Sequence, residues 1–379
     1  MSSIRKREWQ SPTGEIKTAW QVDYRDSAGK RRSKQFPRKK EAERWLTTAS
    51  WQVAQGVHTA DSQSVSVAKA AQLWLDGVRA NNREPTTVAA YEQQVRLHIV
   101  PVCGAVRLSQ LTAPMVRQFL DRWQSSLSRP MATRVFRSFR AVISDAQERG
   151  LVAQNVALAV RIKKAPREKG RIVVPTKADL RAILHTAETM GEQANALMLL
   201  LVFSGLRASE LRGLTWTNID LRRAQLHVTQ RADAHGDMGN PKSRTSHRTI
   251  PLPPRVVAAL KAWKLACPPN ALQLVFPSKR GKPMPHGVMM KSLVTPVQQA
   301  AGTTACDDLL KGKYTLHEFR HAAASMWIDQ GLNPKRVQTL MGHSSIQMTF
   351  DTYGHLFEHA KRDADDAQAI ERALFNDAT

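Results

Sequence analysis

The chain has 379 residues, and its 56 Lys and Arg outnumber its 32 Asp and Glu to give a formal net charge of +24 at pH 7. This length suits two or three domains. The positive charge favours a nucleic-acid partner, because neutralising phosphates releases condensed counterions. Two plainer explanations of the charge are a highly soluble surface and binding to a membrane surface.

Other classes are excluded by what the sequence lacks. No apolar run approaches the roughly 18–20 residues that cross a bilayer, and residues 1–10 lack the apolar stretch of a signal peptide. The cysteines Cys103, Cys267 and Cys306 are too few and too far apart for a disulfide framework or a paired-cysteine metal site. We therefore expect a cytoplasmic protein that does not enter a membrane.

Residues 1–62 have the pattern of a small α+β module. Apolar and aromatic residues in Thr18–Tyr24 predict a strand, and Arg38–Leu46 is typical of a helix. Between them, a turn signal at residues 27–29 precedes a basic run. We take this run as a first set of candidate DNA contacts, Lys30, Arg31 and Arg32. The alternative is that the run forms a solvated face of the sheet.

Residues 63–163 change to a helical pattern, with apolar residues at spacings of three and four. Four main helices are predicted, over Val67–Val78, Thr86–Ile99, Thr112–Trp123 and Arg129–Gln147. Thr112 suits an N-cap, and Gly150 suits the position just past the last helix. That last helix carries Arg134, Arg137 and Arg140 three residues apart, which places them along one side as a second set of candidate DNA contacts.

A charged stretch with Pro and Gly, Arg161–Gly170, predicts a crossing between domains. Residues 171–360 then have the length of a compact domain, in which both helical and strand-like patterns occur. We expect a multidomain chain that is mainly α with small β-sheets. Its end, Lys361–Thr379, has the spacing of an amphipathic helix that either packs on the core or docks on a neighbouring subunit.

Two basic residues stand out in the C-terminal half. Arg207 starts a helix, and Glu210 lies three residues further on, where its carboxylate can hold the guanidinium. Lys242 lies in the Gly-rich tip of a predicted hairpin between the strand-like runs Gln225–Gln230 and Arg248–Leu252. Taken singly, the arginine is more simply a surface charge and the lysine a solvated loop residue.

Histidines and a tyrosine mark two further segments. His317, Arg320 and His321 lie within five consecutive residues. Further along, His343 is followed ten residues later by Tyr353. The plain explanation of this tyrosine is a core residue packed near two phenylalanines.

Together these segments resemble the active site of the tyrosine recombinases, the phage-integrase group. Gly205–Leu211 is similar to the family's Gly-Leu-Arg-x-x-Glu-Leu stretch, and residues 317–321 are similar to its His-x-x-Arg-His box. Its catalytic lysine lies in a hairpin turn ahead of a strand ending Ile-Pro-Leu, as Lys242 does. Residues 340–345 resemble its Leu-Gly-His-Ser-Ser stretch, with Met341 between the Leu and the Gly. The family's nucleophilic tyrosine follows that histidine at a similar distance.

The resemblance assigns six catalytic positions and two supporting ones, namely Arg207, Lys242, His317, Arg320, His343 and Tyr353, with Glu210 and His321. Tyr353 is the implied nucleophile, which forms a 3′-phosphotyrosine link. The two arginines and His343 hold the phosphate oxygens, because preorganised donors stabilise the charge that develops there. His317 takes the phenol proton and Lys242 protonates the leaving 5′ oxygen, with Arg244 on the same turn as a competitor. The covalent link stores the bond energy, so no cofactor, metal or ATP is implied.

The resemblance also implies the domains around the catalytic one. Residues 63–163 look like the family's helical core-binding (SAM-like) domain, and residues 1–62 look like the arm-binding domain of larger integrases. The implied function is integration or excision of a phage or other mobile element. A homotetramer assembled on double-stranded DNA attachment sites would do this, with accessory DNA-bending or directionality proteins as further partners.

Three other functions compete with recombination. Residues 317–321 read His-Glu-Phe-Arg-His, the helix motif in which two histidines bind zinc and a glutamate serves as the base of a protease. A non-catalytic DNA-binding regulator would explain the charge and the helical domain. A topoisomerase would use the same chemistry to relax DNA. The protease gives no reason for the charge, and the regulator gives none for the complete catalytic set. Against the topoisomerase, two domains that clamp DNA plus an arm module favour recombination, with relaxation as a side activity.

Overall fold

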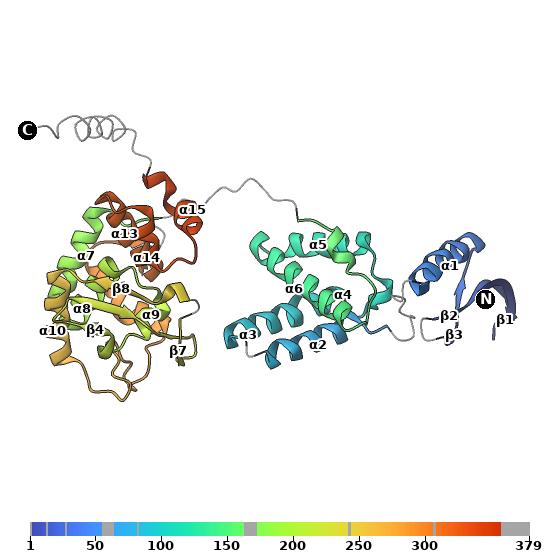
Figure 1. Cartoon of the computed structure of the whole chain (residues 1–379), viewed down its shortest axis with the longest axis horizontal. Coiled ribbons are helices and arrows are strands. Elements are labelled where there is room, and N and C mark those ends of the chain that lie inside the picture. The colour runs from blue at the N-terminus through green and yellow to red at the C-terminus, as the bar shows by residue number, and fades with distance from the viewer. Residues whose placement is uncertain are drawn as a thin grey trace, which may run out of the picture. The chain divides into compact units, whose positions relative to one another are not determined.

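The computed structural model describes residues 2–12, 14–26, 29–54, 64–81, 83–162, 173–241, 244–305 and 308–357. The chain divides into two compact units, residues 1–167 and residues 168–379, which are described separately (Figure 1). Among the described residues, no helix is both long and apolar enough to cross a membrane. The expected architecture, mainly helical with small antiparallel sheets, is confirmed.

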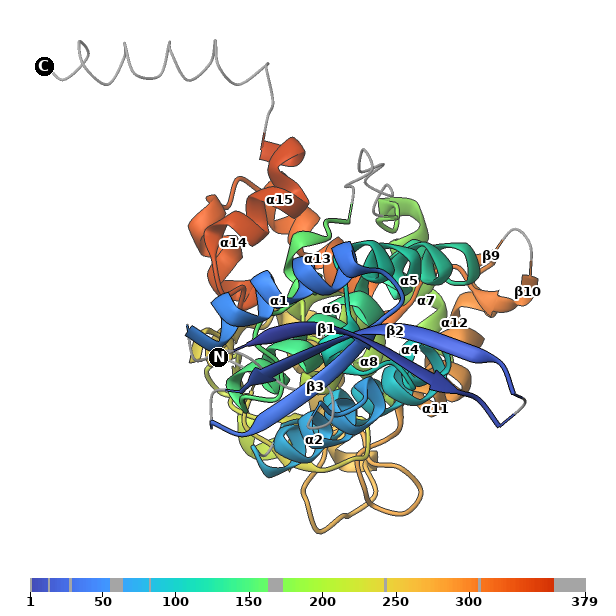
Figure 2. The ribbon, with the colours of Figure 1, turned by 90° about the vertical axis from the view of Figure 1, so that its right-hand side faces the viewer.

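The chain begins with a three-stranded antiparallel sheet in the order β1 (Ser3–Gln10), β2 (Ile16–Arg25), β3 (Arg31–Phe36), followed by α1 (Lys39–Ala54). Figure 2 shows the three strands side by side. One face of the sheet packs on α1, since Trp45 meets the rings of Tyr24 at 5.1 Å and Phe36 at 5.6 Å. The predicted strand and helix are confirmed. The helix continues beyond its predicted end at Leu46, because Ala49 extends the buried face that Ala42 begins.

Four helices form the second part of the first unit, α2 (Val67–Ala80), α3 (Pro85–Gln94), α5 (Ala113–Ser126) and α6 (Arg129–Glu148). Thr112 caps α5 as expected, since its Oγ1 accepts from the backbone N–H of Met115 at 3.4 Å. Gly150, just past α6, has a left-handed φ of 72°. The core is built around α6, whose Val135, Phe136 and Phe139 are fully buried.

The predicted helix Thr86–Ile99 differs in detail from the structure. It starts one residue earlier, at Pro85, and its last turn widens into a π-helical turn over Val95–Ile99 before the short helix α4 (Val100–Cys103). The cause is Pro101, which cannot donate a backbone hydrogen bond and whose ring pushes the preceding turn apart. A second π-helical turn, Met290–Val294, precedes Pro296 in the same way.

The second unit is helical around one buried helix. Its helices are α7 (Lys177–Thr189), α8 (Glu192–Ser204), α9 (Ala208–Arg212), α10 (Pro254–Ala266), α11 (His286–Met289), α12 (Thr295–Ala300), α13 (Leu316–Asp329), α14 (Pro334–Met341) and α15 (Ile346–Phe357). Helix α8 is apolar on every side and packs against α7, α10 and α13. A helix apolar all round belongs in a core, so α8 is the fixed centre from which the candidate site is built.

Small antiparallel sheets complete this unit. They are β4 (Ile219–Asp220), β5 (Gln225–Val228) and β8 (Arg248–Pro251) in the order β4-β5-β8, then β6 (Arg231–Ala232) with β7 (Met238–Gly239), and β9 (Thr304–Ala305) with β10 (Asp308–Gly312). The predicted hairpin is confirmed, since β5 pairs with β8 from Gln225 opposite Pro251 to Val228 opposite Arg248. Its tip at Lys242 and the segment Lys361–Thr379 lie outside the described residues.

Candidate active site

A sharp turn between two helices places Arg207. Helix α8 ends at Gly205, which has a left-handed φ of 58°, and Arg207 is the N-cap of α9. A side chain at Gly205 would also be strained by contact, because its Cβ would come within 2.9 Å of the ring of Trp327. The carboxylate of Glu210 accepts from the backbone N–H of Arg207 at 2.9 Å and from its Nη1 at 2.7 Å. The predicted Arg207–Glu210 pair is therefore confirmed.

Glu210 is buried and serves a second arginine. Its two oxygens also accept from Arg248, Nη1 at 3.0 Å and Nη2 at 2.7 Å. Burial is the largest single influence on Glu210 and opposes its ionisation, but the hydrogen bonds and charges of Arg248 and Arg207 together outweigh it and hold the pKa of this carboxyl below its ordinary value. Glu210 is thus a carboxylate that binds two guanidinium groups at once.

Arg320 lies on α13 and joins two distant turns. Its Nη2 donates to the carbonyl of Met341 at 2.6 Å, and its Nη1 donates to the carbonyl of Gly205. The residue is 4% exposed. Burial first, and then the charge of Arg207, lowers the pKa of Arg320 to about 9, which leaves it charged at neutral pH. Arg207 reaches the same turn, since its Nη2 donates to the carbonyl of Gly342 at 2.5 Å.

His343 follows the end of α14 directly. Gly342 closes that helix with a left-handed φ of 61°, and a Cβ there would meet Arg248 Nη1 at 2.9 Å. The buried imidazole of His343 shares a hydrogen bond with Thr349 Oγ1 at 2.9 Å through Nδ1. Burial, and then the charge of Arg320, lowers the pKa of His343 to about 4. The ring is neutral at neutral pH, so it can donate one hydrogen bond from its other nitrogen.

Tyr353 lies on α15 and is 1% exposed, packed in a small apolar cluster with Ala324, Ile328, Val337 and Met341. Its hydroxyl forms a hydrogen bond of 2.6 Å with Nδ1 of His321. The ring of His343 lies parallel to the Tyr353 ring, with the centroids 6.5 Å apart. Burial raises the pKa of Tyr353 above its ordinary value, so the phenol is protonated at neutral pH.

The two histidines of α13 differ in their contacts. Their rings meet edge to face with centroids 4.5 Å apart, but it is His321 whose nitrogen contacts the tyrosine hydroxyl. His317 is exposed. Burial, and then the charge of Arg320, lowers the pKa of His317, while burial and then His317 lower the pKa of His321 to about 4. Both rings are therefore available as neutral proton acceptors.

The glutamate in the zinc-protease motif of residues 317–321 has a structural role at the start of α13. The carboxylate of Glu318 turns back to the start of α13 and accepts from the backbone N–H of Thr315 at 2.5 Å, as in a capping box. Within the described ranges, no group of three His, Cys, Asp or Glu side chains is arranged to hold a metal ion. The glutamate of this motif is thus accounted for by helix capping.

The structure brings together most of the catalytic residues expected from the sequence. Hydrogen bonds link Glu210 to Arg207, Arg207 and Arg320 to the turn that carries His343, and His321 to Tyr353. Arg248 was not anticipated as part of the site. A signal was present, because strand alternation puts residues 248 and 250 on the same face, and Ile250 is a core residue.

The candidate DNA contacts separate into two kinds. Lys30, Arg31, Arg134 and Arg137 are exposed. The others turn inward. Arg32 Nε donates to Asp26 Oδ2 at 2.8 Å, and Arg140 Nε donates to the carbonyl of Ala157 at 3.0 Å while its guanidinium lies over the ring of Phe136. These two arginines stabilise their own modules, which a basic run in a sequence does not reveal.

Comparisons with known proteins identify relatives among the phage integrases. Residues 174–359 match a family model described as "Phage integrase family", and residues 67–124 match "Phage integrase, N-terminal SAM-like domain". A curated relative, an integrase of Streptomyces ambofaciens, is 27% identical over 309 residues, covering 76% of each chain.

Two solved structures share the fold. The Tn1549 transposon integrase (residues 82–397) in complex with transposon right end DNA has a TM-score of 0.65 at 20% identity, covering 82% of this chain and 100% of that one. A lambda integrase tetramer bound to a Holliday junction has a TM-score of 0.57 at 18% identity, covering 89% and 95%.

Proposed function

Because this chain belongs to the phage integrase family of tyrosine recombinases, we propose that it cuts and rejoins DNA at specific sites through a covalent 3′-phosphotyrosine bond to Tyr353. The product of such a reaction is the integration or excision of a phage or other mobile element in a bacterial cytoplasm. The observation that carries the proposal is the convergence of Arg207, Arg320 and His343 on one turn, with Tyr353 held by a histidine next in sequence to Arg320.

The arginines supply what attack on a phosphodiester needs. The phosphate carries a negative charge that repels a nucleophile, and further charge builds up on its oxygens during attack. Arg207 and Arg320 are fixed by backbone carbonyls before DNA arrives, so their donors cost no reorganisation in the reaction. His343, whose Nδ1 is engaged by Thr349, adds a neutral donor.

The chemistry then needs a proton acceptor and a proton donor. The Tyr353 oxygen bonds to phosphorus as its proton passes to a histidine, and the bond to the 5′ oxygen breaks. We propose Lys242 as the acid that protonates the leaving oxygen, with Arg244 as its competitor on the same turn. Rejoining reverses these steps and uses the stored bond energy, so the cycle is proposed to need neither ATP nor a metal.

The proton acceptor has two candidates, and a pair of variants separates them. Family resemblance assigns the role to His317, whereas His321 is the residue in contact with the hydroxyl. We expect His321→Ala to slow adduct formation by about 10²- to 10⁴-fold and His317→Ala to slow it less. Single-turnover cleavage rates at saturating DNA provide the measurement, and the opposite order would return the role to His317.

We propose that the outer domains bind the DNA around the cleavage point, residues 1–62 at arm-type sites and residues 63–163 at the core site, with residues 171–360 as the catalytic domain. The exposed residues Lys30, Arg31, Arg134 and Arg137 are the proposed phosphate contacts, because a side chain must be accessible on the protein surface to contact phosphate.

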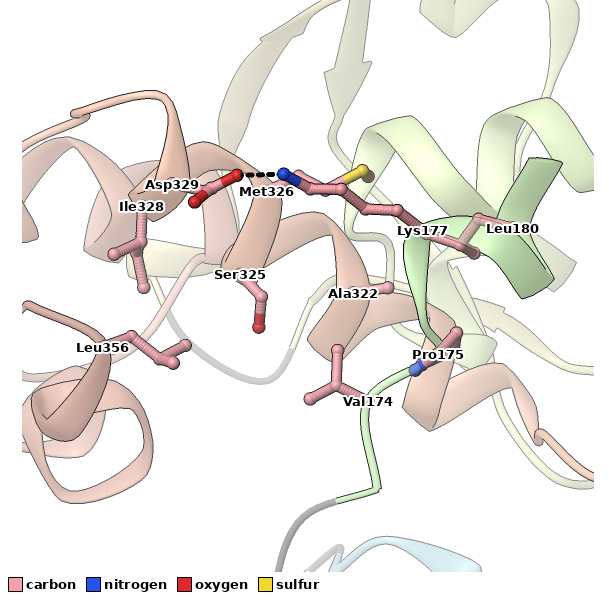
Figure 3. A pocket seen from close by; sticks show the side chains of 10 residues that line it. All are labelled: Val174, Pro175, Lys177, Leu180, Ala322, Ser325, Met326, Ile328, Asp329 and Leu356. Atoms are coloured by element: carbon pink, nitrogen blue, oxygen red, sulfur yellow. Dashed lines mark hydrogen bonds and ion pairs between the residues drawn. The ribbon is translucent and has the colours of Figure 1, made fainter.

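A tetramer on DNA is the proposed assembly, with accessory DNA-bending or directionality proteins as further proposed partners. Strand exchange between two duplexes requires four cuts, and the lambda integrase structure is a tetramer on a Holliday junction. A groove of about 210 Å³ between α7, α13 and α15 is a candidate contact for a neighbouring copy (Figure 3). Apolar side chains dominate its lining, including Val174, Leu180 and Leu356, and the ion pair of Lys177 with Asp329 at 2.5 Å crosses its rim.

We propose that this groove receives the amphipathic segment Lys361–Thr379 of a neighbouring copy. The groove reaches Leu356, next to the last described residue of α15, so it lies near the point where the chain leaves α15 toward this segment in the sequence. Ser325 lines the groove, and its buried Oγ has no hydrogen-bond partner among the described residues, so a large side chain at this position would fill the groove without breaking a hydrogen bond.

Blocking this exchange is expected to impair assembly more than DNA binding. Deleting residues 361–379, or filling the groove with Ser325→Trp, should abolish the two-duplex complex while single-site binding stays within about threefold of wild type. Native gel shifts on one and two duplexes measure both, with Thr189→Trp on the exposed side of α7 as the matched control. Equal loss of both complexes would contradict the proposed exchange.

The function itself is tested by a nicked suicide duplex that carries the attachment core, incubated with the protein and EDTA. A covalent protein–DNA band on a denaturing gel, with the phosphodeoxynucleotide mapped to Tyr353 by mass spectrometry, would establish the reaction. Tight binding without an adduct would instead identify a DNA-binding regulator.

A further inference from the structure

Arg248 is a buried charge next to the candidate site. It is the first residue of β8, and its side chain is 1% exposed. Its guanidinium donates to Glu210 through Nη1 and Nη2, to the carbonyl of Ser246 at 3.0 Å, and through Nε to the carbonyl of Leu340 at 2.7 Å. A guanidinium with so many partners inside the protein has little capacity left to bind DNA.

Two arginines occupy all the hydrogen-bond acceptor sites of the Glu210 carboxylate. One oxygen accepts from Arg207 Nη1 and Arg248 Nη1, and the other accepts from the Arg207 backbone N–H and Arg248 Nη2. Four donors fill the acceptor sites of a carboxylate. Two guanidinium charges share one negative charge, so the cluster keeps one net positive charge. Arg207 is the partly exposed member, with a side chain that is 34% accessible.

The same guanidinium joins three catalytic segments that are distant in sequence. Strand β8 leaves the hairpin whose tip carries Lys242, Glu210 belongs to the helix that Arg207 caps, and Leu340 lies three residues before His343. A Cβ on Gly342 would come within 2.9 Å of Arg248 Nη1, so the turn before His343 lies directly against this side chain.

We propose that Arg248 is a positioning residue that neutralises Glu210, so that Glu210 can hold Arg207 in place without cancelling the charge that Arg207 offers to the scissile phosphate. This inference rests on the proposed function. Without Arg248, the carboxylate would face Arg207 alone and the net charge of the pair would be zero. The hairpin strand would also lose its bond to the end of α14.

The test is a double-mutant cycle in the full-length protein on the suicide duplex. We expect Arg248→Met to lower the single-turnover cleavage rate about 100-fold, and Glu210→Gln to lower it comparably because it leaves Arg248 buried without its counter-charge. The double variant Arg248→Met/Glu210→Gln should recover to within about tenfold of wild type, since neither position then holds a buried charge that has lost its partner and a Gln oxygen still accepts from Arg207. Equilibrium binding to the duplex should change less than about threefold throughout.

A matched control separates positioning from stability. Arg212 lies on α9 and, like Arg248, is a buried arginine. Its Nε donates to the carbonyl of Met284 at 2.6 Å and not to Glu210. Arg212→Met should lose a similar amount of thermal stability and keep the cleavage rate within about threefold. If Arg248→Met is no slower than this control, or if the two single losses simply multiply in the double variant, the inference is overturned. Absence of an adduct in the wild type would overturn the proposed function instead.

Discussion

Replacing Tyr353 by Phe is expected to abolish the covalent adduct, with a loss of at least about 10³-fold in cleavage rate and no detectable band on a denaturing gel. The ring remains to fill the apolar cluster around it, and only the hydroxyl that contacts His321 is removed. The free energy of unfolding should therefore change by no more than about 1 kcal/mol. Binding to the attachment duplex should stay within about threefold of wild type, because the hydroxyl is not a phosphate contact in the resting protein.

Tyr314 provides the control for this variant. It is equally buried, and its hydroxyl donates to Asp179 Oδ2 at 2.5 Å, so Tyr314→Phe removes a comparable hydrogen bond. We expect this variant to form the adduct at nearly the wild-type rate. An adduct that persists in Tyr353→Phe and disappears in Tyr314→Phe would place the nucleophile elsewhere and refute the assignment.

Arg207→Lys is expected to lower the cleavage rate about 10²- to 10³-fold while the positive charge is retained. A lysine carries its three donors on one nitrogen, without the planar fork of a guanidinium, and cannot bind Glu210, the carbonyl of Gly342 and a phosphate in one fixed plane. Because the Arg207 side chain is partly exposed, the variant should fold with a stability within about 1 kcal/mol of wild type.

Single-turnover rates at saturating DNA, together with thermal unfolding, measure these effects. Arg255→Lys is the matched control, since Arg255 is an exposed arginine paired with Glu188 on the surface of the same unit. Its cleavage rate should match wild type. A wild-type rate for Arg207→Lys as well would show that charge alone suffices and that the planar fork of the guanidinium is not required.

The sequence was informative where a contact is local. The Arg207–Glu210 pair follows from a spacing of three on one helix, and the N-cap at Thr112 follows from residue type. The spaced set of catalytic motifs was recognisable as a whole, although no single member was specific. Local chemistry and a family pattern therefore sufficed to place most of the site.

The remaining contacts depend on the tertiary fold. Glu210 and Arg248 are separated by 38 positions, and His321 and Tyr353 by 32, so neither pair has a spacing that a helix or strand would reveal. The inward turn of Arg140 depends on free carbonyls at the end of its own domain. Such partners exist only once the chain has folded, which is why the sequence did not show that Arg32 and Arg140 form hydrogen bonds within their own domains.

Backbone carbonyls hold Arg207 and Arg320, and this determines which substitutions around the site the protein can tolerate. Arg207 and Arg320 are anchored by the main-chain oxygens of Gly342, Gly205 and Met341, and every amino acid has such an oxygen. A substitution at residue 341 changes a core side chain but leaves its carbonyl in place, so the methionine that departs from the family pattern still anchors Arg320. Gly205 and Gly342 differ from residue 341, because their left-handed backbone conformation aims the carbonyls that hold Arg320 and Arg207. Diversification of this recombinase should therefore tolerate change beside the anchors and fail at the glycines themselves.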